Sequence, residues 1–158
     1  MRLPQHLVVL HSDSNSDGAR ARDLKNVLKV LVDKGDVSLW SRRDVAPGML
    51  VRDAVSANFA KADVFVVLLS ADFLAAEQAD LEKVFQAQAY AAAVFVLLRP
   101  CGWQYTKLSG EDGEDDSKIV PRRDGRAAPV TSFSDAADAW QQVLAEVASV
   151  VKRRASSS

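Results

Sequence analysis

The chain has 158 residues, of which 48% are hydrophobic and 26% charged, and its formal net charge is −1. This length suits one domain with a full core. The near-neutral charge gives no electrostatic footprint for nucleic acid or for an anionic membrane. The single cysteine, Cys101, excludes an internal disulfide, and no segment approaches the ~20 apolar residues of a membrane span. We therefore expect a cytoplasmic protein that binds neither nucleic acid nor membrane.

Short apolar runs rich in Val and Leu are the first structural signal along the chain. They are Leu7–Leu10, Val37–Trp40, Val64–Leu69 and Val94–Leu98. These runs do not alternate with polar residues, which is typical of strands buried on both faces of a parallel sheet. We expect a fifth, short edge strand at Val130–Phe133.

Helical periodicity fills the intervals between these runs. Apolar residues recur at spacings of three and four in Ala19–Lys34, Leu50–Lys61, Asp80–Tyr90 and Asp135–Lys152. Strands that alternate with helices through right-handed crossovers form a doubly wound sheet. The expected fold class is therefore α/β, with helices on both faces of the sheet.

Two segments lack any such pattern. Residues 100–128 contain Pro, Gly, Ser and the acidic run Glu111–Asp116, so they predict a long loop with a solvated centre. Residues 153–158 are basic and then serine-rich, and we expect a disordered tail there. The domain is accordingly expected to span residues 1–152.

The loop Ser41–Gly48 combines two arginines and an aspartate with a closing Pro47-Gly48 turn. Proline fixes its own φ and glycine tolerates positive φ, so the pair is a strong local stop. Loops at strand ends are also where α/β domains carry most of their functional residues. Near the N-terminus, the serines and aspartates of Asp13–Gly18 are interpreted as caps of the first helix.

Five segments of the sequence follow one another in a recognisable order. They are LVVLHSDS (7–14), VSLWSRRDVAPG (37–48), KADVFVVLLSADFLA (61–75), VFVLLRPCGWQ (94–104) and APVTSF (128–133). Together they closely resemble bacterial Toll/interleukin-1 receptor (TIR) domains, from about Leu7 to Val151. The resemblance implies a flavodoxin-like fold with five parallel strands and helices on both faces. That fold agrees with the strand and helix patterns.

The resemblance admits two functional classes in cytoplasmic immune or stress signalling. Some TIR domains are NAD+ nucleosidases that release nicotinamide and linear or cyclic ADP-ribose, with NAD+ as substrate and no permanently bound cofactor or metal. Others are non-catalytic modules that recruit further TIR domains. In the enzymes a glutamate early in the third helix carries the reaction, and the local pattern Ala79–Lys83 places that role on Glu82. Glu77 is the fallback, because this segment is about one residue shorter than in bacterial relatives.

A carboxylate suits this chemistry because the departure of nicotinamide gives an oxocarbenium-like transition state that a negative charge stabilises. Enzymatic relatives usually carry an aromatic residue just before the glutamate, where this chain has Gln78 and Ala79. Such an aromatic ring can stack on the nicotinamide or on its ribose, and stacking of this kind contributes ~1–3 kcal/mol per ring to binding. Acidic residues are also favoured in the first turn of any helix. The non-catalytic alternative therefore stays open.

A pocket is expected at the carboxyl ends of the strands, where helix N-termini and arginines suit a pyrophosphate. Its candidate residues for NAD+ are His11, Ser12, Asp13, Trp40, Arg42, Arg43 and Ser70. The alternatives are a solvated or partner-facing loop for the two arginines, a core-edge aromatic for Trp40, and a strand-end hydrogen bond for His11. In the TIR family the Ser41–Gly48 loop is also the main assembly surface, which implies other TIR domains as partners in a homo-oligomer or filament.

A phosphoacceptor receiver domain is the alternative with a similar fold. It requires an acidic pair after the first strand, an aspartate at the end of the third and a lysine at the end of the fifth. Here the third strand ends in Ser70, and no lysine follows Val130–Phe133. The sequence favours the TIR interpretation.

Overall fold

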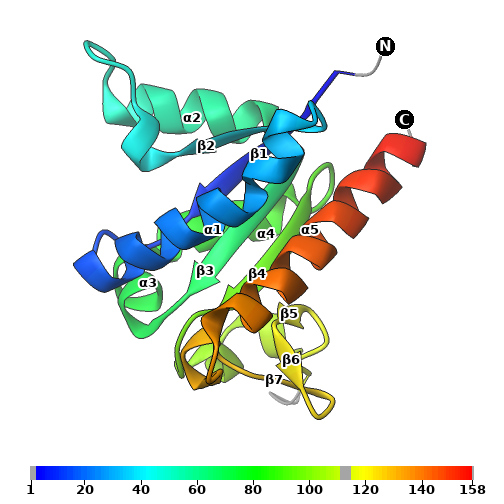
Figure 1. The fold of residues 1–158 in the computed structure, drawn as a ribbon. Helices are drawn as coiled ribbons and strands as arrows, with labels where there is room; N and C mark the ends of the chain where they lie inside the picture. The colour runs from blue at the N-terminus through cyan, green and yellow to red at the C-terminus, as the bar shows by residue number, and fades with distance from the viewer. Residues whose placement is uncertain (1–2, 111–114, 158) are drawn as a thin grey trace.

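Five parallel strands in the order β2-β1-β3-β4-β5 form the centre of the computed structural model, which describes residues 3–110 and 115–157 (Figure 1). The strands are β1 (Gln5–Leu10), β2 (Val37–Ser41), β3 (Val64–Leu69), β4 (Ala92–Leu97) and β5 (Ile119–Val120). This order confirms the predicted flavodoxin-like class. From β1 the chain adds β2 on one side of the sheet and then β3 on the other. The carboxyl ends of β1 and β3, where this switch occurs, are the usual place for a ligand site in such folds.

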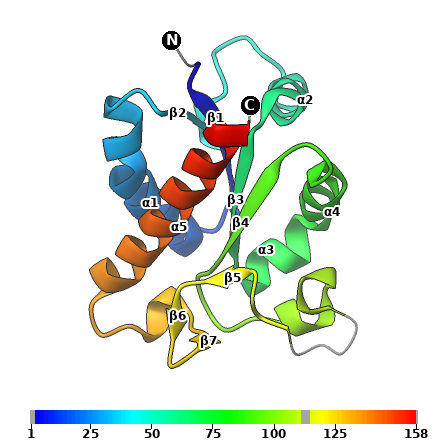
Figure 2. The same ribbon diagram turned by 90° about the vertical axis from the view of Figure 1, so that its right-hand side faces the viewer.

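Two helical layers cover the sheet (Figure 2). The first layer contains α1 (Asn15–Asp33) and α5 (Ala136–Ser157); the second contains α2 (Val51–Lys61), α3 (Ala71–Ala76) and α4 (Gln78–Ala87). Every residue of β3 is buried, because alternate side chains pack against the two layers. None of the helices in the described part of the chain is long and apolar enough to span a bilayer.

The predicted edge strand at Val130–Phe133 is wrong. Val130–Ser132 forms a single 3₁₀ turn, η4, because the amides of Ser132 and Phe133 turn back to the carbonyls of Pro129 and Val130 at 2.9 and 3.2 Å. The turn still lies beside the end of β4, since the Thr131 N–H donates to the Leu98 carbonyl at 3.1 Å. The fifth strand is instead β5, which pairs with Phe95 and Val96.

The segment predicted as a loop contains short elements. They are η2 (Trp103–Tyr105), η3 (Lys107–Ser109), β5 and the hairpin of β6 (Arg122–Arg123) with β7 (Arg126–Ala127). Trp103 and Leu108 are buried in the core beneath α3 and α4, and this packing orders the segment without any helical period. Residues 111–114 of the acidic run lie outside the described residues.

The last helix is longer than predicted. α5 continues through Arg153 and Arg154 to Ser157, where the sequence favours a disordered tail. Arg154 explains part of this extension, because its Nη2 donates to the Tyr90 carbonyl at 3.1 Å and lies 3.8 Å from Asp63 Oδ1. These contacts hold the final turns of α5 against the amino-terminal edge of the sheet.

Candidate functional site

A buried carboxylate lies where β1, β3 and β4 end. Asp17, in the first turn of α1, is fully buried. Its Oδ2 accepts hydrogen bonds from the hydroxyls of Ser12, at 2.6 Å, and of Ser70. Its Oδ1 lies 3.1 Å from Nη2 of Arg99. A buried charge needs such pairing, so Asp17 joins the chain segments that follow three central strands.

Ser12 and Ser70 are predicted from the sequence to lie at this edge, whereas Asp17 is not. The sequence predicts that the residues around Asp17 cap the first helix, and Ser14 does cap α1 by accepting from the Asp17 N–H at 3.3 Å. Helical periodicity is the sequence signal that could have placed the Asp17 side chain at this edge. Asp17 begins the stripe that continues with Ala21 and Leu24 at spacings of four and three, so its side chain faces the sheet.

His11 is buried beside this cluster. Its Nδ1–H donates to the Ser12 carbonyl at 2.7 Å. Burial lowers the pKa of the imidazole, and the charges of Arg43 and Lys25 lower it further. Nε2 has no partner within the described residues. Because Nε2 is itself buried, His11 holds an unsatisfied acceptor inside the protein and does not offer it to a ligand.

Arg42 ties the loop after β2 to the start of α4. Its Nη2 lies 2.5 Å from Asp80 Oδ2, and its Nη1 lies 3.5 Å from Glu77 Oε2. Burial raises the pKa of Glu77, Arg42 opposes that rise, and Asp80 and Asp13 add to it. Asp13 itself is exposed. The Arg42 guanidinium is thus neutralised within the protein by two carboxylates.

The other residues of this loop are held locally. The Ser41 N–H donates to Asp44 Oδ2 at 2.9 Å, and Lys25 Nζ lies 3.7 Å from the same oxygen. Arg43 is exposed and its guanidinium lies over Gly18, where a Cβ would overlap it. Trp40, at the end of β2, is buried in the core. Its packing there corresponds to the core-edge alternative.

Glu82 lies on a different side of α4 from Asp80. Two residues of helix correspond to a rotation of about 200°, and the Glu82 side chain is 49% exposed. Its Oε1 lies 3.0 Å from Lys107 Nζ of η3. The structure therefore gathers Ser12 and Ser70 around Asp17, and Glu77 and Asp80 around Arg42, without Glu82. Within residues 3–110 and 115–157, no three His, Cys, Asp or Glu side chains are grouped to hold a metal ion.

A solved structure shares this arrangement of strands and helices. The crystal structure of the RPS4 and RRS1 TIR domain heterodimer superimposes with a TM-score of 0.57 and 17% sequence identity, covering 93% of this chain and 97% of that chain. The chain has the fold of a TIR domain. Within this TIR fold, Arg42 and the residues after it form the connection between β2 and α2.

A curated protein is also similar to this chain in amino-acid sequence. The uncharacterized protein y4lF of Sinorhizobium fredii is 26% identical over 156 residues, which is 94% of this chain. The chain spans 46% of the length of that relative. No family model matches the chain.

Proposed function

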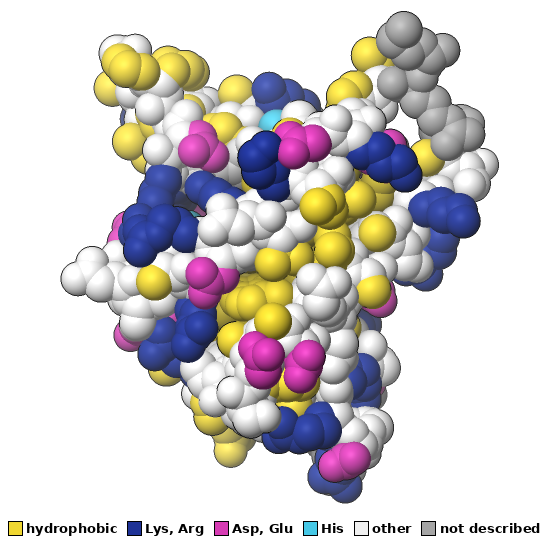
Figure 3. All heavy atoms as spheres, viewed as in Figure 1, with side chains coloured by type: hydrophobic (Ala, Val, Ile, Leu, Met, Phe, Trp, Pro, Cys, Tyr) yellow, Lys and Arg dark blue, Asp and Glu magenta, His cyan; other side chains and the backbone are white. Residues whose placement is uncertain are grey.

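We propose that this TIR fold acts by docking to another TIR domain through the β2–α2 loop (Arg42–Leu50) and the first residue of α2. The observation that carries this proposal is a run of exposed apolar side chains, because Met49, Leu50 and Val51 are 49%, 60% and 55% exposed. Hydrophobic side chains gather over this loop at the upper left of Figure 3. Exposed apolar patches on soluble proteins commonly mark interaction sites.

The base of the β2–α2 loop supports this role because it is already fixed. Arg42 is bonded to Asp80, and Ser41 is bonded to Asp44. A pre-organised loop loses less conformational freedom on binding than a flexible one. The apolar tip can therefore use its contact area for affinity. The similar solved structure is itself a heterodimer of two TIR domains.

Self-association of the wild-type protein and of Leu50→Glu, measured by analytical ultracentrifugation, tests the docking function. We expect the charge at the tip to weaken association by about tenfold or more, since it must be buried against the partner. Tyr105→Glu is the matched control, because Tyr105 is an exposed apolar side chain on η2. If both variants weaken association equally, the proposal is contradicted. It is also contradicted if the wild-type protein neither self-associates nor binds a second TIR domain.

A second candidate function, NAD+ cleavage, is favoured by the environment of Glu77. A carboxyl group with a raised pKa beside a second carboxylate and an arginine is typical of functional sites. Glu77 has this environment, because Asp80 and Asp13 raise its pKa and Arg42 Nη1 lies 3.5 Å from its Oε2. The carboxylate would stabilise the oxocarbenium-like transition state as nicotinamide leaves. Glu82 is the alternative carboxylate, supported by the resemblance in sequence.

Nicotinamide release from NAD+ by concentrated protein, followed by chromatography, tests the second function. Release that is lost in Glu77→Gln but kept in Glu82→Ala supports the site beside Arg42. The opposite result assigns the chemistry to Glu82. No release from the wild type in any assembly state removes the enzymatic candidate and leaves docking.

A further inference from the structure

The edge of β4 that faces β5 is open along its first half. β5 pairs only with Phe95 and Val96. On the other edge, the amides of Ala92 and Leu98 donate to carbonyls of Asp63 and Leu69 at 3.0 Å each. Because successive residues of a strand direct their backbone groups to opposite neighbours, the N–H and C=O of Ala93 face the open edge.

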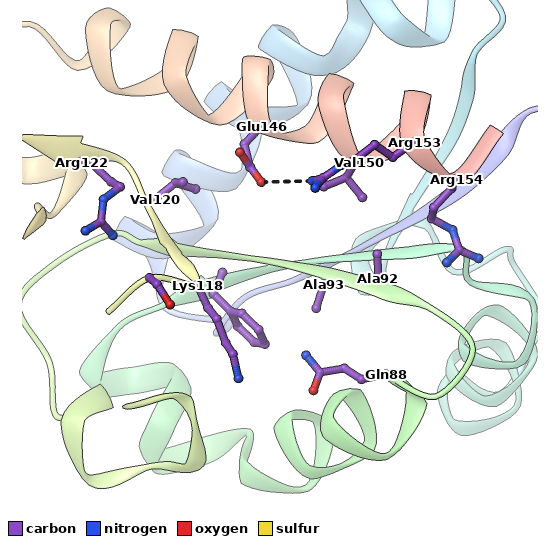
Figure 4. A pocket seen from close by; sticks show the side chains of 12 residues that line it. Gln88, Ala92, Ala93, Lys118, Val120, Arg122, Glu146, Val150, Arg153 and Arg154 are labelled. Carbon is purple, nitrogen blue, oxygen red and sulfur yellow. Dashed lines mark ion pairs between the residues drawn. The ribbon is translucent and has the colours of Figure 1, made fainter. Parts of the chain in front are cut away.

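A cavity of about 730 Å³ lies along this edge (Figure 4). Gln88, directly after α4, lies on one side of the cavity and Val150 of α5 on the other, and Val120 of β5 lies toward one end. Small-molecule sites in proteins are clefts of about 300–1,000 Å³ with mostly apolar walls and a few polar groups. The cavity has that size, and it is a slot in the plane of the sheet with backbone donor and acceptor groups at its base.

Basic side chains predominate among the charged groups of the cavity. The one acid in the lining, Glu146, already lies 3.7 Å from Arg153 Nη2. The four basic residues are Lys118, Arg122, Arg153 and Arg154. Among the described residues, Lys118 has no ion pair within 4 Å, and its side chain extends along the slot in Figure 4. Arg122 lies 3.1 Å from Asp116 and Arg154 lies 3.8 Å from Asp63, so Lys118 is the cation of this lining that can pair with an anionic ligand.

We propose that this slot binds a nucleoside phosphate. The base lies in the plane of the sheet, where β5 would otherwise continue, and its hydrogen-bonding edge meets the N–H and C=O of Ala93. The phosphate is paired with Lys118. This site is separate from the β2–α2 loop and from Glu77, so it does not depend on the proposed function.

An extended peptide fits the same edge less well. The open stretch Ala92–Val94 is only about 10 Å long, and Ala93 alone supplies backbone groups to it. A strand would gain two hydrogen bonds there at the entropic cost of ordering several residues. A heterocyclic base presents a donor and an acceptor together on one rigid edge and can form the same two bonds.

Titration of the protein with AMP, followed by calorimetry and by ¹⁵N chemical shifts, tests this site. We expect AMP to bind, and we expect the amide of Ala93 to be among the signals that shift most. Adenosine and inorganic phosphate should each bind at least about tenfold more weakly, because each lacks one half of the interaction. Equal binding of AMP and phosphate would identify an adventitious anion site and overturn the proposal.

Two variants locate the ligand. Lys118→Glu is expected to weaken AMP binding by about tenfold or more, and Lys61→Glu, an exposed lysine of α2, should leave it unchanged. Val150→Trp should block binding by filling the slot, with unfolding curves as a check on its fold. AMP binding that neither Lys118→Glu nor Val150→Trp reduces would refute the site. So would binding of a short acidic peptide where AMP fails to bind.

Discussion

The carboxyl edge of the sheet and the open edge of β4 differ in how completely their charges are paired. At the carboxyl edge, Asp17 is paired with Arg99 and accepts from two serines, and Arg42 is paired with two carboxylates. At the open edge, Lys118 lies beside a cavity without an ion-pair partner among the described residues. Enclosed charges require internal partners, because water cannot solvate them. Charges beside a cavity can stay available for a ligand.

The largest expected effect comes from breaking the pair at the carboxyl edge. Asp17→Ala should lower the free energy of unfolding by about 3–5 kcal/mol, because it leaves Arg99 without its counter-charge and two buried hydroxyls without their acceptor. Denaturant titration measures this loss. Asp13→Ala is the control, since Asp13 is exposed and should cost less than about 0.5 kcal/mol. Similar losses in both variants would show that Asp17 is not enclosed as described.

Arg42→Ala should have an intermediate effect, of about 1–3 kcal/mol, because the buried carboxylate of Asp80 loses its donor. The β2–α2 loop also loses its attachment to α4, so self-association should weaken in the same variant. Arg43→Ala is the matched control, since Arg43 is exposed. An Arg42→Ala protein as stable as Arg43→Ala would mean that solvent supports Asp80.

The pH dependence of stability tests whether His11 at the carboxyl edge is enclosed. Its pKa in the folded protein is lowered by burial, so the unfolded chain binds the proton more readily. The stabilisation is fully present above the unfolded pKa of about 6.5 and is lost as pH falls toward the folded pKa. His11→Phe should flatten the stability profile between pH 7.5 and 5.5, measured by denaturant titration at each pH. Parallel profiles for the two proteins would contradict the lowered pKa.

Most of the fold follows from local pattern. β1, β3 and β4 are buried on both faces, so they leave apolar runs that no other element explains. β5 has only two residues, and Pro121 after it lacks the N–H that would continue the ladder. A strand that short carries no periodicity. Its place in the sheet follows only from tertiary packing.

The candidate site was partly predictable for a related reason. Ser12 and Ser70 follow central strands directly, and strand ends meet at one edge. The side of α4 that faces that edge could not be read from the sequence, because α3 ends at Ala76 and the helix restarts at Gln78. Glu77 between them has φ −122° and ψ 32°, outside the helical region. This break resets the rotation of the helix, so that Asp80 faces Arg42 and Glu82 does not.

The smallest expected effect is that of Glu82→Ala. Glu82 and Lys107 form an exposed ion pair, and such pairs contribute about 0.2–1 kcal/mol. A double-mutant cycle with Lys107→Ala should give a coupling energy within that range, measured by denaturant unfolding. A larger coupling would mean that the pair is enclosed.

Because Glu82→Ala should leave the fold intact, any loss of nicotinamide release in this variant would report chemistry at the exposed side of α4. The carboxylates beside Arg42 would then be structural partners of the loop.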